Sequence, residues 1–202
     1  MYQYEDVTEA TTPGVRRRGR PPAASREDVL DVALRLYLHG ERVDVQAIAA
    51  QLGLGRTTIY RWFGSREGLV GETVARAAEP LFNEARAGAK GEGGVALLDT
   101  FDRINRALAA APALRSFLEL ERDGLRILTS SSGIVHRRAV AKIQDLIEAE
   151  VRAETFQPPV DPSTLAYAIV RLAEAFLFSD VTAAMRGDVD RLREIEAALL
   201  GV

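Results

Sequence analysis

Apolar residues recur at helical spacing from Ser25 to the C-terminus, in runs that begin at capping residues and end at glycine. The first run follows Ser25 with Val29, Leu30 and Ala33 and stops at Gly40. Side chains three or four residues apart share one face of an α-helix, whereas a half-buried strand alternates with a period of two. No such alternation persists in this sequence. We therefore predict an all-α fold of about nine helices.

Capping residues divide the N-terminal part into four predicted helices. Ser25 precedes the first, Asp44 the second and Ser65 the fourth, and such side chains accept hydrogen bonds from the free N–H groups of a helix start. The third helix, Arg56 to Phe63, follows Gly55 and lacks a side-chain cap. After a glycine-rich joint at 87–94, longer amphipathic helices are predicted at 95–110, 112–128, 134–154, 162–178 and 189–200.

The composition argues against an enzyme. The 202 residues include no cysteine, which removes disulfides, thiol nucleophiles and cysteine-ligated metals. The two histidines, His39 and His136, lie in different predicted modules, and no HExxH, GxSxG or P-loop motif occurs. We expect no catalytic residues, no metal and no cofactor. No apolar run approaches ~18 residues and no secretion signal is visible, so we expect a cytoplasmic protein with no membrane partner.

Positive charge is concentrated in residues 16–66, although the chain carries a net charge of −3. This segment holds ten arginines and five acidic residues, whereas residues 67–202 hold sixteen basic and twenty-one acidic residues. A protein with a negative net charge can still present one basic face to a polyanion. The tract RRRGRPP within residues 1–24 fits a flexible arm that places Arg18 and Arg20 in the minor groove. A solubilising linker is the alternative.

The segment GRTTIYRWF, from Gly55 to Phe63, gathers three aromatic residues within four positions. Ile59 and Phe63 share one stripe and are predicted to face the core, with Trp62 at the edge. The opposite side carries Arg56, Thr57, Thr58, Tyr60 and Arg61. Three short helices with a glycine-containing break match a helix-turn-helix, whose third helix enters the DNA major groove. Packing between domains is the alternative for Tyr60 and Trp62.

The stretch VDVQAIAAQLGLGRTTIYRWFGSREGL resembles the DNA-binding signature of the TetR family of bacterial transcriptional regulators. The resemblance covers residues 25 to about 75 and implies that Thr57, Thr58 and Arg61 face bases and that Tyr60, Trp62 and Arg66 hold phosphates. Gly55 stands where the family usually has a serine, and Trp62 where histidine is frequent. The expected DNA-binding residues are Arg18, Arg20, Gln46, Arg56, Thr57, Thr58, Tyr60, Arg61, Trp62 and Arg66.

In the TetR pattern, the last two helices form a four-helix bundle with their symmetry mates, and palindromic operators require such a dimer. Two apolar stripes suit this role, although part of each must be ordinary intrachain core. The expected dimer-interface residues are Leu165, Ile169, Leu172, Phe176, Leu192, Ile195 and Leu199.

The helices from 95 to 154 resemble the family's ligand-pocket wall and imply a mostly apolar effector, anchored by a polar group such as Arg115 or His136. Each candidate lining residue also fits an ordinary core. The candidates are Phe101, Ile104, Arg115, Phe117, Leu118, Leu125, Leu128, His136, Tyr167 and Phe178. The stretch FLELERDGLRILTSS is similar to the subgroup that regulates degradation of lactone-type quorum signals, a likeness that assigns no ligand.

Three segments are therefore predicted: a flexible arm at 1–24, a helix-turn-helix domain at 25–70, and a ligand-binding and dimerisation domain at 71–202. The expected function is a ligand-responsive repressor that binds operator DNA as a homodimer and is released by a small effector. The competing hypothesis is an all-α scaffold with a vestigial helix-turn-helix. Salt-dependent binding with a strong preference for one palindrome distinguishes the two.

Overall fold

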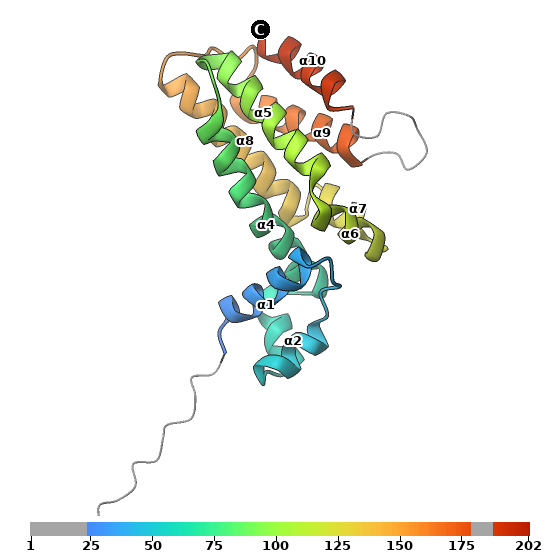
Figure 1. Cartoon of the computed structure of the whole chain (residues 1–202). Coiled ribbons are helices and arrows are strands. Elements are labelled where there is room, and N and C mark those ends of the chain that lie inside the picture. Colours follow the sequence, from blue (N-terminus) through green and yellow to red (C-terminus); the bar gives the residue numbers. More distant parts are fainter. Residues whose placement is uncertain (1–23, 179–187) are drawn as a thin grey trace, which may run out of the picture.

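The computed structural model describes residues 24–178 and 188–202, which form ten α-helices and no strand (Figure 1). The all-α prediction is therefore confirmed for this part of the chain. The helices are α1 (Arg26–Leu38), α2 (Val45–Leu52), α3 (Arg56–Phe63), α4 (Arg66–Gly88), α5 (Gly93–Ala110), α6 (Pro112–Leu120), α7 (Gly124–Thr129), α8 (Ile134–Arg152), α9 (Pro162–Phe178) and α10 (Val189–Leu200). Among them, none combines the length and the apolar character of a bilayer-spanning helix.

The predicted helix starts carry their expected caps. Ser25 and Asp28 form a capping box, in which the Asp28 N–H donates to Ser25 Oγ at 3.2 Å and the Ser25 N–H donates to Asp28 Oδ2 at 2.7 Å. Asp44 Oδ1 accepts from the Gln46 N–H at 2.6 Å, and Ser65 Oγ accepts from the Gly68 N–H at 3.0 Å. These side chains satisfy backbone donors that a helix start leaves free.

The predicted helix at 112–128 is wrong, because the chain breaks into α6 and α7 at Glu121. The backbone of Glu121 is extended, with φ −102° and ψ 111°, and its side chain is buried. That conformation turns its carboxylate towards the N-terminus of α4, where it meets Arg66. A tertiary ion pair thus accompanies a helix break that local spacing did not reveal.

Helix α4 runs through both halves of the molecule (Figure 1). Its first turns contribute Leu69, Val70 and Val74 to a core shared with α1, α2, α3, α6 and α7. Its last turns contribute Ala85 to a second core shared with α5, α8, α9 and α10. A movement of α4 would therefore reach both cores.

The close approach of α4 and α8 depends on Gly71. A Cβ atom at this position would lie 2.6 Å from Ile134 Cγ2, which is inside van der Waals contact. We expect Gly71→Ala to lower the free energy of unfolding by about 1–3 kcal/mol, because the added methyl overpacks a filled interface. Urea unfolding followed by circular dichroism measures this. Gly55→Ala, where a Cβ meets nothing within 4 Å, is the control and should change stability far less.

Candidate nucleic-acid interface and internal cavity

Helix α3 has one buried face and one exposed face, as its sequence predicts. Ile59 is 0% exposed and Phe63 is 7% exposed, and both belong to the core that holds α1 and α2. Tyr60 is 41% exposed, Arg61 is exposed, and Trp62 is half-buried against the same core. Of the remaining candidates on α3, Arg56 and Thr57 are exposed and Thr58 is half-buried. The outward groups can therefore reach a neighbouring molecule while the helix stays anchored.

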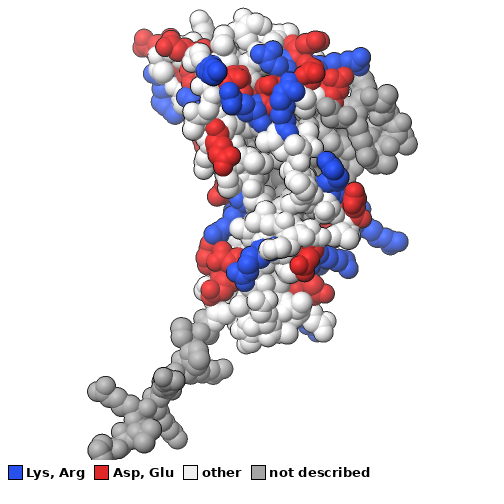
Figure 2. All heavy atoms as spheres, in the orientation of Figure 1, with Lys and Arg blue, Asp and Glu red and all other residues white. Residues whose placement is uncertain are grey.

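The turn before α3 and the charge around it also suit a polyanion. Gly53 ends α2 in the left-handed conformation, with φ 64°, which a glycine adopts without strain. Gln46 is exposed on α2, and no acidic residue occurs between Asp44 and Glu67. On the face drawn in Figure 2, the extreme tip of this half shows no acidic side chain, whereas both charges are mixed over the opposite end. The predicted arm residues Arg18 and Arg20 lie outside the described residues.

Arg66 is half-buried and bonds to other parts of the protein. Its guanidinium donates to both carboxylate oxygens of Glu121, at 3.0 and 2.5 Å, and its Nε and Nη2 donate to the Val43 carbonyl at 3.2 and 3.0 Å. These contacts occupy most of its N–H groups inside the protein. These contacts favour an internal role for Arg66 over the predicted phosphate contact. Arg66 joins the start of α4 to the loop before α2 and to the α6–α7 break.

A second charged cluster links α3 to α8 through α4. Glu72 is buried on α4 and bonds to Arg26 at the start of α1, and its other oxygen lies 3.7 Å from Arg138 Nη2 on α8. The Arg26 guanidinium in turn lies 4.5 Å from the ring centroid of Phe63, a distance typical of a cation–π contact. Arg138 also lines the internal cavity, so this cluster runs from the cavity wall to the end of α3.

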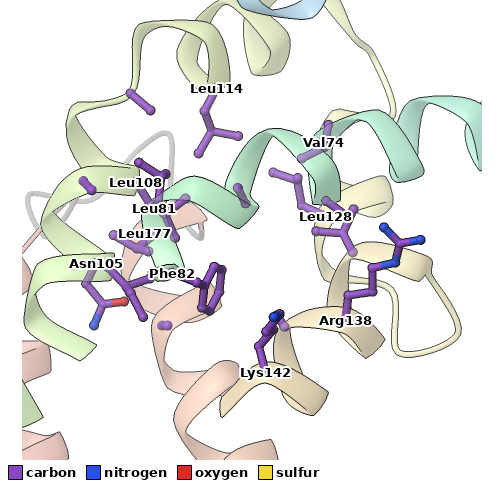
Figure 3. Close-up of a pocket in the computed structure, with 18 of the residues that line it drawn as sticks. Val74, Leu81, Phe82, Asn105, Leu108, Leu114, Leu128, Arg138, Lys142 and Leu177 are labelled. Carbon is purple, nitrogen blue, oxygen red and sulfur yellow. The ribbon is translucent and has the colours of Figure 1, made fainter. Parts of the chain in front are cut away.

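A cavity of about 800 Å³, within the size range of small-molecule sites and partly open to the surface, lies mainly in the C-terminal half. Every helix except α2 and α3 contributes to its wall. Figure 3 shows Phe82 and Leu81 of α4 facing the same space as Leu108 and Leu177. The lining is mostly apolar, and its exposed end carries Arg138 and Lys142.

Half of the predicted ligand residues line this cavity. Those that do are Phe101, Ile104, Leu128, His136 and Phe178. Those that do not, and for which the prediction is corrected, are Arg115, Phe117, Leu118, Leu125 and Tyr167. The reason is their direction from the backbone: Phe117 is buried in the core under α1, whereas Arg115, Leu125 and Tyr167 are exposed.

Two pairs of buried polar side chains lie in the cavity wall, His136 with Glu174 and Asn105 with Glu196. The sequence did not predict either pairing. His136 Nδ1 lies 2.7 Å from Glu174 Oε1, and Arg171 donates to the other oxygen of Glu174 at 2.7 Å. Across the chain, Asn105 Nδ2 donates to both oxygens of Glu196, at 3.1 and 3.3 Å. Burial raises the pKa of Glu196 to about 7, with a further contribution from the Asp102 carboxylate, while the Asn105 hydrogen bond opposes the shift.

Comparison with known proteins identifies the family. A family model described as "Tetracyclin repressor-like, C-terminal domain" matches residues 92–201, more than half of the chain, and one described as "Helix-turn-helix domain of resolvase" matches residues 19–65. The HTH-type transcriptional regulator AlkX of Mycobacterium tuberculosis is 30% identical over 162 residues, covering 77% of this chain and 75% of that protein. The chain belongs to the TetR family.

Solved TetR-family structures share its fold. The transcriptional repressor QsdR of R. erythropolis is 28% identical, with a TM-score of 0.81 over 88% of this chain and 94% of its own. The repressor AlkX of Dietzia, described as implicated in biodegradation of n-alkanes, is 21% identical with a TM-score of 0.59, over 93% and 99% of the two chains. This TetR-family chain is thus a transcriptional regulator with a helix-turn-helix DNA-binding domain.

Only some of the predicted dimer-interface residues are exposed on the surface of the single chain. Leu165, Ile169 and Leu192 are 0–2% exposed within the single chain, so they are intrachain core and the interface prediction is wrong for them. Ile195 is 38% exposed. Leu172, Phe176 and Leu199 are half-buried and keep some surface to offer a partner.

Proposed function

We propose that this TetR-family regulator is a ligand-responsive repressor that binds a palindromic operator as a homodimer. The observation that carries the proposal is the division of α3: Ile59 and Phe63 hold it in the core, while Tyr60 and Arg61 point outward. The proposed base-reading residues are Thr57, Thr58 and Arg61, with Gln46, Arg56, Tyr60 and Trp62 on the backbone. Arg18 and Arg20 complete the set if the arm enters the minor groove.

The cavity supports the ligand-responsive part of the proposal. Helix α4 begins at Arg66, directly after α3, and walls the cavity from Val74 to Phe82. An effector that fills the cavity can therefore favour a different position of α4. In that position the two recognition helices of a dimer would no longer have the spacing of successive major grooves. Release follows only if the effector binds that arrangement more tightly than the DNA-competent one.

Two charged contacts provide a route for this coupling. The Arg66–Glu121 pair connects the α6–α7 break to the loop before α2, and the Glu72 cluster connects α8 to the end of α3. Leu114 of α6 and Leu128 of α7 line the cavity on one side, and Arg138 lines it on the other. Movement of either wall is thereby communicated to the helix-turn-helix.

Arg61 is the residue whose removal tests the operator-reading role most directly. We expect Arg61→Ala to cost about 1–3 kcal/mol of discrimination at one base pair, because a guanidinium that bonds a base edge is lost. Gel-shift titrations with DNA from upstream of the chain's own gene, and with single-base variants, measure it. Arg35→Ala is the control, since Arg35 is exposed on α1 rather than on α3.

The scaffold alternative makes opposite predictions in the same assay. A repressor shows a log affinity that falls linearly with log salt and a large preference for one sequence. Equal affinity for all duplexes, or none at low salt, would contradict the proposed function.

A further inference from the structure

We propose that the cavity selects an uncharged, largely apolar molecule that carries hydrogen-bond donors, and that Asn105 is the residue that reads one of them. This inference rests on the proposed role of the cavity as the effector site. It adds the chemical class of the ligand and a specificity-determining residue.

The Asn105 side chain is held in one orientation by Glu196. Asn105 is 4% exposed, and its Nδ2 group donates to both oxygens of the fully buried Glu196. Because Nδ2 lies against the carboxyl group of Glu196, the other arm of the amide, Oδ1, lies on the opposite side. Glu196 therefore fixes Asn105 so that an acceptor, rather than a donor, faces the other direction.

The free acceptor of Asn105, Oδ1, faces the cavity. Asn105 Oδ1 has no hydrogen-bond partner among the described residues. In the same part of the chain, no side-chain nitrogen or oxygen is both enclosed and without a partner. Since Asn105 lines the cavity, Oδ1 must open into it. Figure 3 shows Asn105 extending from α5 beside Phe82 and Leu177, apart from Arg138 and Lys142.

His136 presents a second polar group to the same space. It is 3% exposed, and its Nδ1 faces the Glu174 carboxylate at 2.7 Å. The second ring nitrogen, Nε2, takes no part in this contact with Glu174. Nε2 also has no partner among the described residues, and His136 lines the cavity. The mostly apolar wall thus contains one acceptor, Asn105 Oδ1, and one ring nitrogen, His136 Nε2, that have no partner among the described residues.

The charges of the wall disfavour an anionic ligand. Glu174 already forms an ion pair with Arg171, and Glu196 is a second acidic residue in the wall. At the exposed end the lining holds Arg138 and Lys142 together with Glu79 and Asp145, and Figure 3 shows the two basic side chains lying apart from Asn105. A carboxylate entering the interior would meet the acceptor Oδ1 of Asn105 and, among the described lining residues, no buried lysine or arginine. A neutral hydroxyl or N–H group can donate to Oδ1 directly.

The test compares three probes of equal chain length: decanol, decyl methyl ether and decanoate. The ether lacks the donor, and decanoate replaces it by a negative charge. Each is titrated into the full chain loaded with Nile red, a neutral apolar dye, and displacement is read from the loss of fluorescence. We expect decanol to bind about tenfold more tightly than either of the others, the worth of one net hydrogen bond.

The matched variant replaces both partners, Asn105→Leu with Glu196→Leu, which leaves no buried polar group without a partner. We expect its preference for decanol over the ether to fall by about tenfold while the ether still binds. Lys90→Gln, at an exposed residue outside the cavity lining, is the control and should leave the order of the probes unchanged. Tightest binding of decanoate, or an unchanged preference in the double variant, overturns the proposal, as does a failure of Nile red to bind.

The two proposals fail in different assays. If decanol is preferred but the chain shows no sequence-specific DNA binding, the ligand class stands and the repressor function falls. If operator binding is specific but the probes show no preference for a donor, the reverse holds.

Discussion

Replacing Glu121 with methionine is expected to lower the free energy of unfolding by about 2–3 kcal/mol, because it strips the Arg66 guanidinium of its carboxylate. The pair is bidentate, and Glu121 is 6% exposed at its side chain whereas Arg66 is 28% exposed. The loss is set below the roughly 3–5 kcal/mol of a fully enclosed pair, since water reaches part of Arg66. Urea unfolding followed by circular dichroism measures the change.

A double-mutant cycle separates the pair from its surroundings. Arg66→Met should cost a similar amount, because Glu121 keeps only Arg42 at 3.5 Å. The double variant should recover much of the loss, since neither charge is then left without its partner. Arg126→Met is the control: its pair with Glu67 joins α7 to the same turn of α4 but is exposed on both sides, and no measurable change is expected. Simple additivity of the two single losses would contradict a coupled pair.

The same variants distinguish the internal role of Arg66 from a phosphate contact. A residue that binds phosphate lowers affinity for all DNA sequences and reduces the salt dependence when it is removed. The structure instead predicts that Glu121→Met and Arg66→Met have similar effects on operator binding, because both break one connection. A loss confined to Arg66→Met, with a shallower salt slope, would restore the phosphate role.

The helices could be predicted from the sequence because their causes are local. Ser25, Asp44 and Ser65 cap their own helices within three residues, and the stripe of Ile59 and Phe63 follows from helical geometry alone. The break at Glu121 could not be predicted in this way. Its partner Arg66 lies 55 residues away in the sequence, so no window around Glu121 contains the interaction.

The cavity was predicted less well than α3, for a related reason. An apolar residue on an amphipathic helix fits a core and a cavity wall equally, so spacing could not separate Phe101, which lines the cavity, from Phe117, which does not. The sequence did contain one indication of the cavity wall, namely polar residues on apolar helix faces. Asn105 and Glu196 interrupt apolar faces of α5 and α10, and buried polar groups of this kind require partners. Because 91 residues separate them in the sequence, their pairing with one another could not be predicted.

The pH dependence of stability should report on Glu196. Its pKa is raised from 4.5 to about 7 by burial, so the folded state holds the proton more tightly than the unfolded state does. This contribution to stability is complete below about pH 4.5 and is lost as the pH rises through about 7. The loss amounts to about 3 kcal/mol above that range.

Glu196→Gln isolates this contribution, because glutamine stays neutral and its carbonyl can still accept from Asn105 Nδ2. The variant should match the parent chain near about pH 4.5 and exceed its free energy of unfolding by about 3 kcal/mol near about pH 8. Urea unfolding at both pH values provides the difference, from which the titration of all other groups cancels. Glu194→Gln, an exposed neighbour on α10, serves as the control and should follow the parent at both values. A Glu196→Gln variant that loses stability equally at both pH values would mean that the carboxyl is ionised in the folded chain throughout, and that Asn105 is oriented by a fixed charge.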